Sequence, residues 1–508
     1  MCGIIAILGP NAHQWADHLP PVLERMSHRG PDEQGTYVGE NILLGQTRLS
    51  IIDVAGGRQP IFAEDTRKCI ICNGEIYNHL DLRRGLSQQH RFRTNSDTEV
   101  ILHLFEEDGE QAVSKLDGMF AFVVYDGKDI LVARDPLGIK PLYYGQKDDC
   151  LFFASEIKAL GGMIDNILEF PAGYYYSSSQ QKFSQYYLMP PITEWKEDVN
   201  EISQGLHDRL YRVVEKRWMS DVPVGCFLSG GLDSSLICAI SKQNFQHLDT
   251  FSVGFEDESQ DLIYAEKVAQ FLGTTHHEYT YTKNDVLEAL PNIIYHLESF
   301  DPALVRSAIP CYFVSRLTRE YVKVILTGEG SDEVFAGYHY FKRFDDKQDV
   351  HQEAMRILNG LHNMNLQRVD RATMAHSIEA RVPFLDMGFV EYAMSINPEL
   401  KLAGKAKRIE KWLLRQAFTD YLPDEIIWRP KMEFAAGCGS EELLTHWTED
   451  TISDAEFEQE RRNLESIDIS SKEELCYFRI FRDFFGSDVN IAAIGRWQGG
   501  LSREGSDL

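Results

Sequence analysis

The sequence lacks several features that mark particular classes of protein. Its 508 residues contain no run of about eighteen apolar side chains, so we expect no membrane-spanning helix. The first ten residues, MCGIIAILGP, include no basic side chain, and we therefore expect no signal peptide. The nine cysteines are scattered without the spacing of a disulfide framework, which favours reduced thiols in a cytoplasmic protein. Cys69 and Cys72 form a C-x-x-C inside an apolar stretch, and without a second pair we interpret them as packing residues.

Positive charge is also scarce. The chain has 51 lysines and arginines against 78 aspartates and glutamates, a formal net charge of -27. Such a field repels a phosphate backbone, which argues against a nucleic-acid partner. ATP is anionic as well, so an ATP site here needs a local positive environment of backbone N–H groups, a metal ion and basic side chains. The apolar fraction of 43% is sufficient for the cores of several domains.

Short strand patterns separated by turn residues characterise residues 2–185. The expected strands are Gly3–Leu8, Ile42–Leu44, Lys68–Cys72, Met119–Tyr125 and Ile130–Arg134. An Asp-Gly pair joins the last two strands, which is a strong hairpin signal. Apolar side chains on one face predict a helix over roughly Thr98–Glu107. We expect this part of the chain to form a domain of its own.

The pattern changes after a segment rich in proline and charge. We expect residues 186–204 to be a linker, because they contain LMPPITEWKEDVNE. Beyond it strands such as VGCFL and DTFSVGF alternate with helical segments such as LIYAEKVAQFLG. This alternation predicts a doubly wound parallel α/β domain over residues 205–488, with extra helices after about residue 350 and ligands at the carboxyl ends of its strands. Residues 489–508, rich in Gly and Ser, are expected to be a loose tail.

Cys2 directly follows the initiator methionine. If that methionine is removed, one residue carries both a thiol and a free α-amino group. The amine titrates near neutrality and can take the proton of the thiol, directly or through water. Nucleophile and general base would then belong to the same residue. A cysteine at position two can also occur by chance, so the hypothesis depends on its companions.

Four motifs accompany Cys2 in the first half of the chain. They are HRGPD at 28–32, RLSI at 48–51, NGEIYN at 73–78 and SDTE at 96–99. Their order and residue types resemble the class II glutamine amidotransferase domain, which is an N-terminal-nucleophile (Ntn) fold with an αββα sandwich. The resemblance covers most of residues 2–185, and it implies that Cys2 attacks the side-chain amide of glutamine.

The same resemblance implies how glutamine is held. The Asn73 side chain and the Gly74 backbone N–H would form the oxyanion hole. Arg48 would bind the α-carboxylate of glutamine, and Glu75 and Asp97 would bind its ammonium group. The chemistry agrees, because a zwitterion needs a guanidinium and carboxylates on opposite sides, and a tetrahedral oxyanion needs preorganised donors.

A glycine-rich loop, SGGLDSS at 229–235, lies between an apolar strand and a helix in the second half. Its glycines let backbone N–H groups approach a phosphate, and the following helix N-terminus favours anions. It is not a Walker A motif, since the G-x-x-x-x-G-K-[ST] pattern is missing. The loop resembles that of the ATP pyrophosphatases, which cleave ATP between the α- and β-phosphates. The implied products are AMP and pyrophosphate.

Three later segments extend this resemblance: GEGSDE at 328–333, SIEARVPFLD at 377–386 and WRPK at 428–431. With the loop they are similar to the synthetase domain of the glutamine-hydrolysing asparagine synthetases of type B, over residues 205 to about 485. Arg381 and Asp386 of the second segment could alternatively pair with each other in a structural loop.

The resemblance to these synthetases implies a set of nucleotide contacts. Leu228 and Val253 would contact adenine, and Glu329 would support formation of an acyl-adenylate. Arg381 and Lys431 would neutralise developing phosphate charge. Carboxylates suit Mg²⁺, which prefers oxygen ligands, and the implied metal residues are Asp233 and Asp332. The implied ATP-binding residues are Leu228, Ser229, Gly230, Gly231, Asp233, Ser234, Val253, Thr327, Gly328 and Lys431.

The family's reaction follows from the resemblance: L-aspartate, ATP, L-glutamine and water give L-asparagine, AMP, pyrophosphate and L-glutamate. Ammonia would travel between the two sites through an apolar internal passage. The resemblance leaves room for a homodimer. One alternative keeps both sites but amidates another carboxylate, such as a peptide, a sugar or an antibiotic precursor. A second alternative is a degenerate scaffold or nitrogen sensor, which loss of Cys2, Asp233 or Asp332 would have favoured; all three are present.

Overall fold

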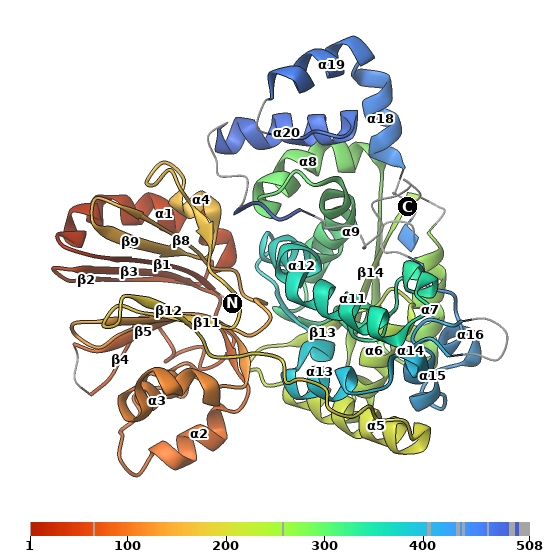
Figure 1. Ribbon diagram of the computed structural model, residues 1–508, viewed down its shortest axis with the longest axis horizontal. Helices are drawn as coiled ribbons and strands as arrows, with labels where there is room; N and C mark the ends of the chain where they lie inside the picture. The colour runs from red at the N-terminus through yellow and green to blue at the C-terminus, as the bar shows by residue number, and fades with distance from the viewer. Residues whose placement is uncertain are drawn as a thin grey trace.

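The computed structural model describes residues 2–64, 67–256, 259–403, 408–432, 437–438, 442–464, 467–486 and 493–496. Two units are visible, a β-rich one at the amino end and a larger α/β one (Figure 1). Within the described ranges, no helix combines the length and the apolar character needed to cross a bilayer.

The N-terminal unit is a sandwich of two six-stranded antiparallel sheets. In spatial order the first sheet contains β10 (Leu168–Glu169), β8 (Tyr143–Lys147), β9 (Cys150–Ala154), β1 (Cys2–Leu8), β3 (Ile42–Arg48) and β2 (Glu33–Val38). The second contains β12 (Lys182–Gln185), β11 (Tyr174–Ser177), β7 (Ile130–Arg134), β6 (Gly118–Tyr125), β5 (Cys69–Ile76) and β4 (Ile61–Phe62). Helices α1 (Leu19–Arg25) and α4 (Ile157–Leu160) lie by the first sheet, and α2 (His79–Leu86) and α3 (Glu99–Asp108) by the second (Figure 1).

Strand alternation explains the layers. In β1, Ile4 belongs to the core between the two sheets, whereas Ile5 belongs to the core under α1. Successive side chains of a strand point to opposite faces, so a strand buried on both faces is apolar throughout. Cys69 and Cys72 of β5 likewise lie in different cores, and both are free thiols. The expected αββα sandwich and the packing role of this C-x-x-C are confirmed.

The second unit is built on a parallel sheet with strand order β15-β14-β13-β16-β17. The strands are β13 (Val224–Phe227), β14 (Asp249–Phe255), β15 (Thr275–Tyr281), β16 (Val324–Leu326) and β17 (Glu379–Arg381). Around them lie α6 (Leu232–Asn244), α7 (Gln260–Leu272), α8 (Lys283–Leu297), α9 (Pro302–Thr318) and α12 (Asn365–Met374) (Figure 1). The strand order reverses between β13 and β16, which is where ligands bind in folds of this kind. The expected doubly wound domain is confirmed.

The second unit has further α-helices within the described ranges. They are α5 (Val199–Lys216), α10 (Ser331–Val334), α11 (Lys347–Gly360), α13 (Met387–Met394), α14 (Pro398–Lys401), α15 (Trp412–Ala417), α16 (Asp424–Ile427), α18 (Leu443–Thr451), α19 (Asp454–Asn463) and α20 (Lys472–Phe485).

Two features depart from the sequence expectations. Helix α5 begins at Val199, inside the range expected as linker, because the Asp198 side chain accepts hydrogen bonds from two N–H groups of its first turn. Strand β17 lies in the segment SIEARVPFLD, which the sequence did not indicate as a strand. Most of the expected tail 489–508 lies outside the described residues.

The two units share a boundary that is apolar in one part and ionic in another. Tyr77 and Met119 of the sandwich belong to the large core of the second unit. Nearby, Arg29 of the sandwich makes two hydrogen bonds to Asp370 of α12, at 2.9 and 3.2 Å, and its side chain is fully buried. Arg371 of α12 pairs with Glu156 of the sandwich at 2.9 Å. Buried charges of this kind require specific partners, so these ion pairs hold the two units in one relative position.

Candidate active sites

The first candidate site surrounds Cys2, where the two sheets of the sandwich approach each other. Cys2 begins β1, and Asn73 lies in β5 of the other sheet. The backbone N–H of Cys2 donates to Oδ1 of Asn73 at 3.0 Å. Nδ2 of Asn73 is buried and has no hydrogen-bond partner in the described part of the chain. Because a buried unpaired donor is costly, this amide is well suited to donate to the oxygen of a ligand.

The Cys2 thiol itself is in a dry environment. Burial raises the pKa of the Cys2 thiol, and a hydrogen bond to the Leu49 backbone and the charge of Arg48 lower it in part. Since the thiolate is the reactive form, a thiol of this kind needs a base close by. If Met1 is removed, the Cys2 nitrogen that donates to Asn73 becomes a free amine, which can serve as that base.

Gly74 allows β5 to run close to β6. Its φ is 156°, and a Cβ at this position would lie 2.1 Å from the carbonyl oxygen of Met119. Any side chain would therefore push the two strands apart at the point next to Asn73. The predicted oxyanion contact from the Gly74 N–H stays a prediction.

Arg48, predicted to bind the α-carboxylate of glutamine, lies opposite Cys2 in the β1–β3 pairing. Its Nη1 donates to Oε2 of Glu33 at 2.7 Å, and its Nη2 donates to the carbonyl oxygens of Ile52 and Asp53. The guanidinium is therefore fixed by the loop that follows β3. A carboxylate that binds Arg48 through these hydrogens has to replace some of these partners.

The two carboxylates predicted for the ammonium group are buried, with Glu75 in β5 and Asp97 shortly before α3. Burial raises the pKa of Glu75 well above its usual range, and the nearby Glu379 and Asp97 raise it further. Burial also raises the pKa of Asp97, although its Oδ2 accepts a hydrogen bond from the N–H of Ile76 at 2.7 Å. An ammonium group placed between Glu75 and Asp97 would relieve this repulsion.

The second candidate site is a pocket at the reversal point of the parallel sheet. The loop 229–235 follows β13, and residues 327–332 follow β16, so both rims come from neighbouring strand ends. Ser234 Oγ lies 3.1 Å from both the N–H and the Oγ of Ser229, which closes the loop on itself. Gly328 packs against this loop, and a Cβ there would lie 2.8 Å from the Ser234 nitrogen. The two rims are thus in direct contact.

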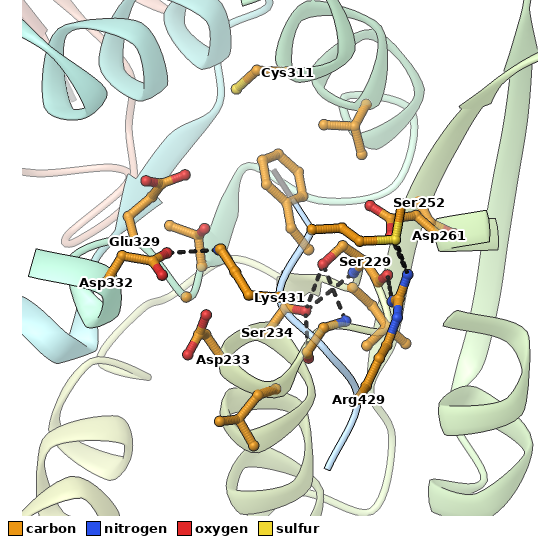
Figure 2. Close-up of a pocket in the computed structure, with 18 of the residues that line it drawn as sticks. Ser229, Asp233, Ser234, Ser252, Asp261, Cys311, Glu329, Asp332, Arg429 and Lys431 are labelled. Carbon is orange, nitrogen blue, oxygen red and sulfur yellow. Dashed lines mark hydrogen bonds and ion pairs between the residues drawn. The ribbon is translucent and has the colours of Figure 1, made fainter. Parts of the chain in front are cut away.

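Two aspartates and two lysines form a charged cluster in this pocket. Nζ of Lys411 lies 2.6 Å from Asp233 and 2.7 Å from Asp332, and Nζ of Lys431 lies 2.7 Å from Asp332. Figure 2 shows Lys431 reaching across the pocket to Asp332, with Asp233 below. Burial alone would raise the pKa of Asp332, but Lys411 and Lys431 hold it well below its usual range.

The donor set of this cluster fits a magnesium ion. Both aspartates contact the same lysine nitrogen, so their carboxylates converge on one region of the pocket. Mg²⁺ is usually bound by one or two carboxylates together with the phosphate oxygens of a substrate. Asp233 and Asp332 are the residues that would hold it.

The pocket has a second charged side, and its basic residues outnumber its acidic ones. Glu329 pairs with Arg368 of α12 at 2.5 Å. Across the pocket, Arg429 pairs with Asp261 at 2.9 Å (Figure 2). The acidic lining residues are Asp233, Asp261, Glu329 and Asp332, and the basic ones are Arg368, Lys411, Arg415, Arg429 and Lys431. The pocket thus has the local positive environment that an anionic ligand needs in a chain of net charge -27.

Of the residues predicted to contact ATP, only Gly230 is absent from the pocket lining. Its φ is 68°, and a Cβ there would lie 2.5 Å from the Ala265 nitrogen, so it shapes the loop against α7. Leu228 and Val253 line the apolar part of the pocket, while the predicted Glu329 and Asp332 line its charged part.

Arg381 is placed differently from the prediction. It does not line the pocket and is fully buried at the boundary between the two units. Nε of Arg381 donates to Glu379 at 2.6 Å, and Nη2 lies 3.6 Å from Oε2 of Glu75 in the thiol site. Strand β17 pairs with β16 and thereby directs this side chain toward the sandwich. The predicted contact of Arg381 with phosphate is therefore corrected, as is the alternative pairing with Asp386, which binds Lys216 and Arg217.

Several pocket residues were missed by the sequence analysis. Arg429 belongs to the quoted run WRPK, of which only Lys431 was chosen. Lys411, Arg415 and Arg368 come from segments without a recognisable motif, and only folding brings them to the pocket.

Helix α12 reaches both sites. Its Arg368 pairs with Glu329 in the pocket. Two residues later, Asp370 holds Arg29, whose Nε donates to the carbonyl oxygen of Cys2 at 3.0 Å. The two candidate sites are thus joined by a short series of buried, charge-assisted contacts.

Comparisons with known proteins agree with this two-site arrangement. A family model described as a glutamine amidotransferase domain matches residues 1–205, and one described as asparagine synthase matches residues 205–348 and 342–488. Asparagine synthetase [glutamine-hydrolyzing] 2 of Arabidopsis thaliana is 40% identical, covering 97% of this chain and 89% of its own. The probable asparagine synthetase [glutamine-hydrolyzing] of Schizosaccharomyces pombe is 39% identical, covering 96% and 94%. A solved glutamine phosphoribosylpyrophosphate amidotransferase from B. subtilis is 19% identical over 55% of this chain and 65% of its own, with a TM-score of only 0.33.

Proposed function

The chain belongs to the asparagine synthase family, and from this premise we propose that it is a glutamine-dependent asparagine synthetase. The reaction converts L-aspartate, ATP, L-glutamine and water into L-asparagine, AMP, pyrophosphate and L-glutamate. The observation that carries the proposal is that α12 connects the buried site around Cys2 with the pocket at the reversal point of the parallel sheet.

In the thiol site, Sγ of Cys2 attacks the side-chain carbonyl carbon of glutamine, and the α-amino group of Cys2 takes the thiol proton. The tetrahedral oxyanion accepts a hydrogen bond from the unpaired Nδ2 of Asn73 and from the N–H of Gly74. Ammonia leaves, and water hydrolyses the thioester to release glutamate. Arg48, Glu75 and Asp97 hold the α-carboxylate and ammonium groups of the substrate, which Arg48 can do after exchanging partners.

In the pocket, a β-carboxylate oxygen of aspartate attacks the α-phosphorus of ATP and pyrophosphate leaves, giving β-aspartyl-AMP. Lys411 and Lys431 offset the charge that develops on the phosphates, in place of the Arg381 first predicted. A bound Mg²⁺ supplies further charge neutralisation, and Asp233 and Asp332 are its ligands in this proposal. Ammonia then attacks the acyl carbon and AMP leaves, with Glu329 close to the reacting carboxylate.

Three further points belong to the proposed function. Ammonia passes between the two sites through the interior of the protein. Its path crosses the boundary between the two units, where α12 lies with its ion-paired Asp370 and Arg368. A cytoplasmic location is supported by the free state of all nine cysteines. A homodimer stays a prediction.

A different acceptor carboxylate is the alternative function. Product analysis by mass spectrometry, with glutamine, ATP, Mg²⁺ and a panel of acids, distinguishes the two. We expect asparagine and AMP with aspartate alone; amidation of another acid with no asparagine would overturn the assignment.

The variant Cys2→Ala tests whether glutamine hydrolysis and asparagine synthesis take place at separate sites. It is expected to lose synthesis from glutamine and to keep synthesis from added ammonia, because only the thiol site is changed. Retained glutaminase activity in this variant would refute the role of Cys2. Loss of ammonia-dependent synthesis as well would refute the independence of the pocket.

A further inference from the structure

Three side chains with metal-binding chemistry gather in the sandwich, and none of them belongs to either candidate site. His90 lies in the segment between α2 and α3, and His103 and Glu106 lie on α3. One nitrogen of each imidazole and one oxygen of the carboxylate all lie within 4.8 Å of one another. Within the described ranges no other histidine, cysteine and carboxylate group meets this condition.

The separations suit a tetrahedral metal site. Oε2 of Glu106 lies 2.9 Å from Nδ1 of His103 and 3.3 Å from Nδ1 of His90. In a tetrahedral zinc site with metal–ligand distances near 2.0–2.1 Å, neighbouring ligand atoms are roughly 3.3 Å apart. The two rings lie side by side, with centroids 4.7 Å apart and planes inclined by 34°. An ion in front of Oε2 can therefore reach both imidazoles with small side-chain adjustments.

Each imidazole also has a carboxylate at its other nitrogen. Nε2 of His90 lies 2.7 Å from Glu107, and Nε2 of His103 lies 3.5 Å from Glu99. Histidines that bind a metal commonly donate their remaining N–H to a carboxylate, which fixes the tautomer and the ring orientation. The other oxygen of Glu106, Oε1, is held by Lys68 at 2.9 Å, so Oε2 is the one directed at the rings.

We propose that His90, His103 and Glu106 bind a divalent transition-metal ion of the zinc type, through the two Nδ1 atoms and Oε2, with water as the fourth ligand. Two imidazoles and one carboxylate suit zinc better than Mg²⁺ or Ca²⁺, which prefer oxygen ligands. The side chains of His90 and Glu106 are about 15% exposed, so solvent can deliver the ion and supply the water.

The ion would stabilise the segment that leads to the thiol site. Glu99, beside His103, accepts hydrogen bonds from the N–H groups of Arg93 and Thr94. These residues directly precede Asp97, whose carboxylate lies in the candidate glutamine site. A metal joining His90 to α3 would tie both ends of residues 90–99 to the same helix. The role inferred for the ion is structural, and metal binding does not depend on the proposed function.

Zinc titration against a chromophoric chelator, with excess Mg²⁺ present, tests the site directly. We expect one tightly bound equivalent in the unmodified chain, and its loss in His90→Gln and in Glu106→Gln. The control His247→Gln changes an exposed histidine that contacts Asp249 in the other unit, and it should keep the equivalent. Cys2→Ala should also keep it, which separates this site from binding by the catalytic thiol.

Cobalt(II) gives a second readout, because tetrahedral Co²⁺ has intense visible bands. These bands should appear on titration of the unmodified chain and of Cys2→Ala, and be absent in His90→Gln. Circular dichroism of His90→Gln checks that this variant is folded. We expect the spectrum of the unmodified chain, which separates a loss of metal from a loss of structure. Equal zinc stoichiometry in the unmodified chain and His90→Gln, or no bound zinc in either, overturns the proposal.

Discussion

At the scale of single residues, the chemistry of both sites depends on polar groups that burial has left either unpaired or shared. Nδ2 of Asn73 is buried without a partner within the described part of the chain, while its Oδ1 is occupied by the Cys2 N–H. Lys411 is shared by two carboxylates in the other site. The unpaired amide of Asn73 is costly without a ligand and becomes favourable when it donates to an oxyanion, whereas Lys411 is already paired and brings positive charge to a bound phosphate.

Asn73→Ala is predicted to lower the kcat of glutamine hydrolysis by about 10²–10³, the usual effect of removing one oxyanion donor. Ammonia-dependent synthesis should be unchanged, because the pocket is intact. Glutamate release and pyrophosphate release measured on the same preparation check both statements. Equal losses in the two activities would indicate a folding defect and contradict the assignment.

Lys411→Ala is predicted to lower pyrophosphate release by about 100-fold or more, because two carboxylates would face an incoming triphosphate without their common cation. Glutaminase activity should remain. Lys267→Ala is the matched control, since Lys267 pairs with the exposed Glu425 and lies over the Tyr264 ring, outside the pocket lining, and should change neither rate. An unaltered rate of pyrophosphate release in Lys411→Ala would remove this lysine from the proposed mechanism.

At the scale of secondary-structure elements, side-chain caps and buried ion pairs determine where the helices around the pocket begin. The Asp386 carboxylate caps α13 by accepting from the N–H of Phe389, and it also pairs with Lys216 at the end of α5 and with the following Arg217, at 2.5 and 3.1 Å. Burial alone would raise the pKa of Asp386, but these two cations lower it from 3.8 to about 2. One side chain therefore joins α13, α5 and the end of the β17 segment.

Asp386→Asn keeps a capping oxygen and removes the charge, so it isolates the ion pairs. A carboxyl group whose pKa is lowered on folding contributes stability that is present above about pH 4 and is lost as the pH falls through about 2. The pKa shift corresponds to about 2 kcal/mol at neutral pH. We expect Asn to lower the urea midpoint at pH 7, and the difference from the unmodified chain to shrink as the pH falls below about 4. A difference independent of pH would contradict this account.

At the scale of the whole molecule, the ionic boundary between the units aligns two sites that have no chemistry in common. Arg29 contacts the Cys2 carbonyl and Asp370, and α12 carries Asp370 and the Arg368 that holds Glu329. The geometry of one site is thereby sensitive to the geometry of the other. Arg381, close to Glu75, adds a further contact between the two units.

Asp370→Asn is predicted to destabilise the chain by about 3 kcal/mol, because the buried Arg29 keeps Glu156 but loses its other charged partner. It should also uncouple the reactions, so that more than one glutamate is released for each asparagine formed. Thermal unfolding and the glutamate-to-asparagine ratio check the two effects. Arg319→Ala, which alters an exposed pair with Glu320, is the control and should leave both unchanged. A ratio that stays at one in Asp370→Asn would show that this contact is only structural.

The sequence by itself determined what depends on neighbours along the chain. Strand and helix patterns predicted the strands of the first unit and the parallel sheet of the second, since side-chain period follows directly from backbone geometry. The sandwich itself was implied by the resemblance of the motifs to a known family. The loop 229–235 and the segment after β16 were identified because a phosphate loop is made by consecutive backbone N–H groups and glycines. Cys2 and Asn73 were identified from motifs and meet at 3.0 Å in the structure.

Only the tertiary structure decided the contacts between segments that are distant in sequence. The sequence contains no motif around Lys411 or Arg368, and none that marks the group of His90, His103 and Glu106. Folding, and not spacing along the chain, brings the partners of these side chains close. Arg381 lies in a recognisable motif, but its direction depends on β17 joining the sheet and turning the side chain toward Glu75. The partner of a charged side chain in a buried site is chosen among all the helices and strands packed around that site. A single segment of the sequence contains only one of these elements, so it cannot show which partner is chosen.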